Sequence, residues 1–111
     1  MNVNASLIVT IVRKGWGSSV LQASVKAGAR GGTVLHGRGA GIHEHEKIFG
    51  MSIEPEKEVV FTIVPDDQVD GILGEIMRAA ELETAGHGMA FVVPVRSIVG
   101  VADSMLFTSK A

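Results

Sequence analysis

Hydrophobic residues along the chain fall into two patterns, continuous β-branched runs and apolar stripes with helical spacing. Residues 6–12 and 58–64 are β-branched runs bounded by turn residues, which predicts two well-buried strands. Two further strands are predicted over residues 33–36 and 89–95. Pro94 lies inside the last of these, which indicates a bulge or a position at a sheet edge.

Two other segments repeat apolar residues at three- and four-residue steps, the spacing of one helical face. The first predicted helix covers residues 16–29. The second begins after Pro65 and runs to about residue 81, with Asp66 and Asp67 expected to supply its N-cap and an acidic first turn. Trp16 and Met77 are expected in the core. The helical stripes consist of Trp16, Val20, Ala23 and Ala27, and of Val69, Ile72, Leu73, Ile76, Met77 and Ala80.

The order strand, helix, strand, strand, helix, strand predicts an α+β chain with the βαββαβ topology of the ferredoxin-like fold. In that fold a four-stranded antiparallel sheet carries both helices on one face. If the second face met water, the strands would alternate apolar and polar residues, but both sets of alternate positions in 6–12 and 58–64 are mostly apolar. We therefore expect the second face to pack against other copies of the chain, in a number that this pattern leaves open.

Composition narrows the class of protein. The 111 residues form one domain of ordinary globular balance, with 46% hydrophobic and 20% charged residues. A net charge of −2 makes a nucleic-acid partner unexpected, and the absence of cysteine excludes disulfides and thiolate chemistry. The chain shows no signal-peptide pattern and no apolar run of about 20 residues, so we expect a cytoplasmic protein without direct membrane insertion.

Glycine-rich stretches provide the first candidate site. Residues 37–57 form a long segment without clear periodicity, and three of its four glycines, Gly37, Gly39 and Gly41, allow consecutive backbone N–H groups to converge on an anion. The spacing is not that of a P-loop. Gly86-His87-Gly88 is a similar stretch, and the fold can bring the two loops together across a subunit boundary to form one cleft. The alternative is that both are only turns. Residues 102–111 form a tail in which apolar and polar residues are mixed.

Histidines offer a second candidate site. His36, His43 and His45 carry imidazole ligands suited to zinc or a similar ion, and the alternative is a solvated, charged loop. No arrangement of serine, histidine and acid is discernible, so the chain is not expected to be an enzyme.

Three motifs resemble the PII signal-transduction family. The first is Val64-Pro65-Asp66-Asp67-Gln68-Val69-Asp70, which is similar to the strand-to-helix junction of that family. The second is the stretch 86–95, which resembles its Gly-Asp-Gly-Lys-Ile-Phe-Val-x-Pro-Val segment. The third combines Gly32-Thr33-Val34 with Gly37-Arg38-Gly39, at the start of the long T-loop. The resemblance covers residues 6–101 in order.

This resemblance implies a single PII-like domain over residues 1–111, assembled as a homotrimer with nucleotide clefts between subunits. It also implies that the T-loop, here about 37–57, changes conformation with the bound nucleotide and docks on a membrane transporter or a metabolic enzyme. The residues implied to bind nucleotide are Gly32, Thr33, Gly37, Arg38, Gly39, Gly86, His87, Gly88 and Met89. Those implied to bind the partner are His43, His45, Lys47, Phe49 and Ser52.

The sequence departs from the family where phosphates are bound. A lysine and two arginines clamp the phosphates in the family, and their positions fall on Met89, Gly100 and Ala102 here. Because charge-assisted contacts are the stronger kind, we expect AMP or ADP, with a small anion or metabolite, rather than ATP. Arg38, His87 and Arg96 are candidate substitutes, and no cofactor is expected. The alternatives are a metal-responsive trimer using His36, His43 and His45, and a structural subunit without ligand.

Overall fold

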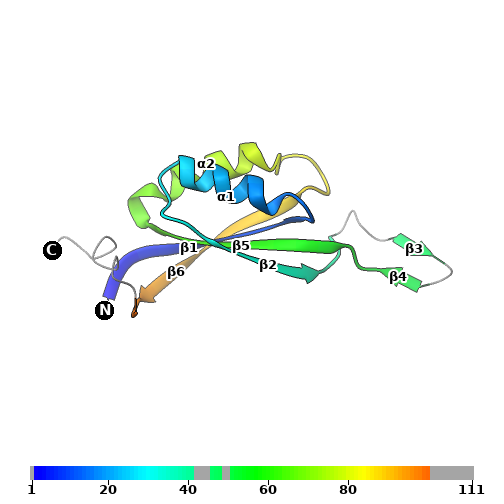
Figure 1. Ribbon diagram of the computed structural model, residues 1–111, viewed down its shortest axis with the longest axis horizontal. Coiled ribbons are helices and arrows are strands. Elements are labelled where there is room, and N and C mark those ends of the chain that lie inside the picture. Colours follow the sequence, from blue (N-terminus) through cyan, green and yellow to red (C-terminus); the bar gives the residue numbers. More distant parts are fainter. Residues whose placement is uncertain (1, 42–45, 49–50, 101–111) are drawn as a thin grey trace.

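The computed structural model describes residues 2–41, 46–48 and 51–100. Its main sheet contains four strands, β1 (Asn2–Arg13), β2 (Thr33–Arg38), β5 (Glu56–Pro65) and β6 (Gly88–Ser97), in the order β2-β5-β1-β6 with antiparallel pairing. Both helices, α1 (Gly17–Lys26) and α2 (Val69–Ala79), lie on the same face of this sheet (Figure 1). The predicted βαββαβ arrangement and the edge position of Pro94 in β6 are confirmed.

The core lies between the sheet and the helices. Alternate residues of the central strands point into it, and these side chains are almost completely buried. The helices contribute one or two fully buried residues each, spaced as the sequence predicts. The fully buried apolar residues are Ile8, Val12, Val20, Val60, Val64, Ile72, Ile76 and Ala80. Trp16 packs against this cluster and is partly buried, whereas Met77 is 42% exposed, so its expected core position is wrong.

The two helices are shorter than the apolar spacing predicts. α1 ends at Lys26, and α2 is preceded by a 3₁₀ turn over Asp66–Gln68 that continues directly from β5. The expected N-cap role of Asp66 and Asp67 is wrong, because α2 begins at Val69 with Gln68 as its N-cap residue and no side-chain cap bond. Asp66 instead accepts a 2.6 Å hydrogen bond from the Ser6 hydroxyl. The junction between β5 and α2 is therefore held by a hydrogen bond to β1 and not by a local N-cap.

The segment 37–57, which has no clear periodicity, contains regular structure. β2 extends to Arg38 and β5 begins at Glu56, so both strands reach further than predicted. Between them lie β3 (Glu46–Ile48) and β4 (Met51–Ile53), paired antiparallel in a separate two-stranded sheet that projects beyond the end of the main sheet (Figure 1). Three-residue strands are too short for period-two alternation to be recognised.

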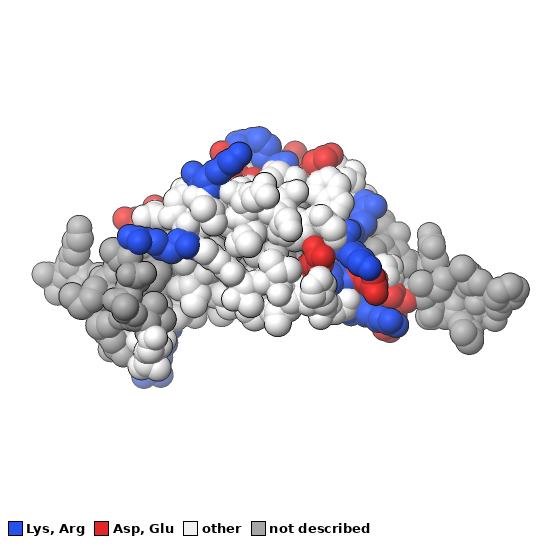
Figure 2. All heavy atoms as spheres, in the orientation of Figure 1, with Lys and Arg blue, Asp and Glu red and all other residues white. Residues whose placement is uncertain are grey.

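The face of the main sheet opposite the helices is apolar and uncovered. Its exposed large side chains come from β2, β5 and β6, and most of them are between 39% and 41% exposed. We name this surface the open face. Its exposed members are Leu35, Phe61, Ile63, Phe91 and Val93. Figure 2 shows that charged atoms gather over the helices and at the end of the sheet nearest β3 and β4. Contiguous apolar area of this kind marks an interaction surface.

Among the described residues, no helix has the length and apolar character needed to cross a membrane.

Candidate functional site

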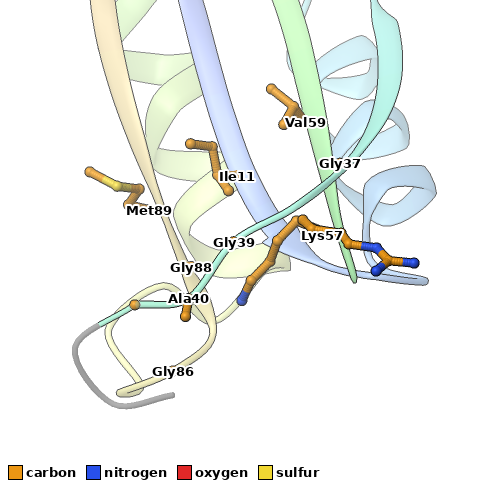
Figure 3. A pocket seen from close by; sticks show the side chains of 11 residues that line it. Ile11, Gly37, Gly39, Ala40, Lys57, Val59, Gly86, Gly88 and Met89 are labelled. Carbon is orange, nitrogen blue, oxygen red and sulfur yellow. The ribbon is translucent and has the colours of Figure 1, made fainter. Parts of the chain in front are cut away.

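A hollow of about 640 Å³ lies on the open face at the end nearest β3 and β4. Its floor is a row of three apolar side chains, Met89 of β6, Ile11 of β1 and Val59 of β5, which are direct neighbours in the sheet register (Figure 3). The floor therefore continues the uncovered apolar surface of the strands. We name this feature the glycine hollow, because five glycines also border it: Gly37, Gly39, Gly41, Gly86 and Gly88.

One wall is the chain that leaves β2, from Gly37 to Gly41. Gly37 still pairs with Lys57 of β5, and the Gly39 N–H donates to the Pro55 carbonyl at 3.1 Å, which keeps the chain beside β5. A Cβ added at Gly37 or Gly39 would meet no atom within 4 Å. The glycines thus leave open space next to the backbone, where a ligand can approach the chain closely.

The opposite wall is the loop that leads into β6. The Arg13 guanidinium donates from Nε to the Gly86 carbonyl at 3.0 Å, and the His87 N–H donates to the Thr84 carbonyl at 3.2 Å. Gly88 has a φ of +140°, and a Cβ there would lie 2.2 Å from the Ile11 carbonyl oxygen. Only glycine fits this approach of the loop to β1, so Gly88 is required for the shape of the wall.

The His87 side chain contacts Trp16 and is not part of the lining of the hollow. Its ring lies 5.5 Å from the Trp16 ring, centroid to centroid, at an interplanar angle of 59°. The ring atom Nδ1 is buried without a hydrogen-bond partner within the described part of the chain. His87 therefore positions the loop on Trp16 and does not line the hollow.

The charge of the lining is positive. Arg38 and Lys57 are its charged residues, and the described lining contains no acid. Lys57 is 7% exposed, and its amine extends toward Gly39 and Ala40 in Figure 3. An apolar floor with two cationic residues in its lining suits a ligand with a flat apolar ring and a small anionic group.

The structure brings together six of the nine residues expected to bind nucleotide. Gly37, Arg38, Gly39, Gly86, Gly88 and Met89 border the glycine hollow, whereas Gly32, Thr33 and His87 do not. Gly32 is needed for packing, because a Cβ there would lie 2.8 Å from the Phe61 carbonyl. Arg96 lies near the other end of β6, far along the strand from Met89.

Sequence reasoning missed Ile11, Lys57 and Val59, which also line the hollow, whereas Ala40 and Gly41 belong to the predicted glycine stretch. Ile11 and Val59 are ordinary apolar strand residues, so only the register identifies them. Lys57 was detectable in principle, because it stands directly across from Gly37 once the two strands are paired. That pairing, however, requires β2 to extend beyond His36, where the predicted strand ends.

The described residues include only part of the expected partner-binding and metal-binding sites. Lys47 and Ser52 pair across β3 and β4, while His43, His45 and Phe49 lie outside the described residues, as does the tail over 102–111. The described part of the chain contains no group of three metal-ligating side chains. His36 is exposed, with Nδ1 3.8 Å from the Glu58 carboxylate.

Comparison with known proteins identifies the family of this chain. Residues 5–104 match the family model of the nitrogen regulatory protein P-II, so the chain belongs to the P-II family. Among solved structures, PII from Arabidopsis thaliana, in a crystal structure described as bound to citrate, matches with a TM-score of 0.71 and 28% identity. The match covers 92% of this chain and 87% of that chain. No curated protein matches the chain. Members of the P-II family are signalling regulators.

Proposed function

We propose that the chain is a trimeric PII-type sensor whose glycine hollow binds an adenine nucleotide with few phosphates. Binding sets the conformation of residues 37–57, and a protein partner such as a transporter or metabolic enzyme responds to that conformation. A ligand shifts such a loop equilibrium only as far as it binds one conformation better than the other. The loop begins at the wall of the hollow itself, which supports a direct link between ligand and loop.

The observation that carries this proposal is the position of the hollow at the border of the open face. Its floor of Ile11, Val59 and Met89 is contiguous with the apolar residues that no helix covers. A second copy packed on the open face would close the hollow on its exposed side. Three copies arranged in this way form the assembly that the family resemblance implies, with one ligand cleft at each subunit boundary.

The proposed preference for AMP and ADP over ATP depends on Met89. Its side chain is 55% exposed at the floor, at the position where the family resemblance places a lysine. A thioether cannot compensate the charge of an added phosphate, so AMP and ADP fit the lining better than ATP. The Arabidopsis structure is described as bound to citrate, which supports a small carboxylate as a second ligand of this chain.

Calorimetry with AMP, ADP, ATP and cyclic AMP tests the proposal. We expect the wild type to bind AMP and ADP more tightly than ATP. Met89→Lys should strengthen ATP binding roughly ten- to hundredfold, because it restores one charge-assisted phosphate contact. Met77→Lys is the matched control, since it adds the same charge at an exposed methionine of α2 outside the lining, and should leave ATP binding unchanged.

Millimolar or weaker binding of all four nucleotides by the wild type would contradict the proposed sensor. The absence of any thermal shift with nucleotides would favour a structural subunit without ligand. An equal gain in Met89→Lys and Met77→Lys would show that general charge, not the contact at the floor, controls the preference.

A further inference from the structure

Arg38 lies on the strand pair β2–β5, where alternation decides which face each side chain occupies. Val34 pairs with Val60, His36 with Glu58 and Arg38 with Glu56, so these residues share one face of the two strands. Val60 is fully buried beneath the helices, which identifies that face as the helix side. The Arg38 side chain therefore starts from the face opposite the floor of the glycine hollow.

Glu58 confirms this assignment. One of its carboxylate oxygens accepts a 2.7 Å hydrogen bond from the Gly17 N–H, at the beginning of α1. The other lies 3.8 Å from His36 Nδ1, the cross-strand neighbour of Glu58. Glu56, one step further along this face, is bonded to Lys14 at 2.8 Å. Figure 2 shows acidic and basic atoms mixed at this end of the sheet.

Arg38 borders two hollows. Besides the glycine hollow it lines a second one of about 450 Å³, which it shares with Lys14, His36 and Glu56. The groups in this second hollow interact: the pKa of Glu56 is lowered, mainly by its hydrogen bond to Lys14 and the Lys14 charge, and also by the nearby Arg38. Arg38 thus lies between a carboxylate on one side of the strand pair and the open space beside Gly39 on the other.

We propose that Glu56 is a specificity-determining residue, which weakens the binding of di- and triphosphates by drawing Arg38 to the helix side. This role rests on the proposed nucleotide function. Each further phosphate adds negative charge, and Arg38 is one of the two cations of the described lining. A ligand phosphate must therefore compete with the Glu56 carboxylate for the guanidinium, and AMP loses least by this competition.

Glu56→Gln is the test, because it removes the charge and keeps the size of the side chain. Directly opposed charges on neighbouring strands stabilise each other only modestly, so we expect ADP affinity to rise about two- to fivefold and AMP affinity to rise less. Glu54→Gln is the matched control, since Glu54 is also exposed and outside both linings. It should leave the ADP-to-AMP affinity ratio unchanged.

A double-mutant cycle separates this role from general electrostatics. In an Arg38→Gln background, Glu56→Gln should no longer improve ADP binding. A gain that persists without Arg38, or an equal gain in Glu54→Gln, would overturn the assignment while leaving nucleotide binding intact. If neither the wild type nor any variant binds ADP or AMP, the proposed function fails and this role fails with it. Glu56 is half-exposed, and unchanged melting temperatures should show that each variant folds.

Discussion

Phe61→Glu should convert the proposed trimer into folded monomers. Phe61 lies on the central strand β5 within the open face, where it is 39% exposed in the single chain, and a copy packed on that face would bury it. Burying a carboxylate without a partner costs about 3–5 kcal/mol at each interface, which corresponds to a loss of more than a hundredfold in association. Light scattering after size exclusion should give a mass near 11.7 kDa instead of three times that value.

Val25→Glu is the matched control. Val25 is even more exposed, at 47%, but it lies on α1 in the helix layer. This variant gains the same charge and should keep the mass of the wild type. If Val25→Glu dissociates the assembly and Phe61→Glu does not, the copies associate through the helices instead of the sheet. A wild type that is itself monomeric would contradict the proposed closure of the glycine hollow.

Gly88→Ala should produce the largest loss of stability among the glycine variants. The new Cβ would lie 2.2 Å from the Ile11 carbonyl oxygen, and the φ of +140° is unfavourable for any L side chain. Strain of this kind and the enforced shift of the strand cost about 2–5 kcal/mol together. We expect the melting temperature to fall by roughly 10 °C or more, measured by circular dichroism at fixed protein concentration.

Two further alanine variants separate the effect of the close approach to Ile11 from the effect of backbone strain. Gly86 has a φ of +82° but open space around its Cβ position, so Gly86→Ala should cost only about 1–2 kcal/mol of backbone strain. Gly71 lies in α2 with ordinary φ and open space, and Gly71→Ala should stabilise by about 0.5–1 kcal/mol. Equal losses at Gly88 and Gly86 would contradict the close approach of the loop to β1.

The fold was predictable because its signals are local and repeated. The β-branched runs around Val9 and Phe61, together with the stripe from Val69 to Ala80, determine the order of strands and helices. The excess of apolar residues in those strands also indicated a covered second face, and the single chain leaves that face exposed. Helix ends were less predictable. Asp66 is a residue type that favours N-cap positions, but its side chain accepts a hydrogen bond from Ser6, 60 residues earlier, instead of capping the helix.

The glycine hollow was predictable only in outline. The two glycine stretches indicated its walls, because glycine is required wherever a backbone must approach another group closely. Its floor was not predictable, since Ile11 and Val59 differ from their strand neighbours only in the face that they occupy. The orientation of His87 depends on its contact with Trp16, and that of Arg38 depends on its strand pairing with Glu56. Both interactions connect separate parts of the sequence.

Binding of an adenine nucleotide in the glycine hollow can be observed by amide NMR during an ADP titration. We expect saturable shifts at the N–H groups of Gly37, Gly39, Gly86 and Gly88, the glycines in the two walls of the hollow. Amides on the outer surface of α2 should stay unchanged. Shifts confined to α2, or no saturable shift at any of the four glycines, would contradict binding in the glycine hollow.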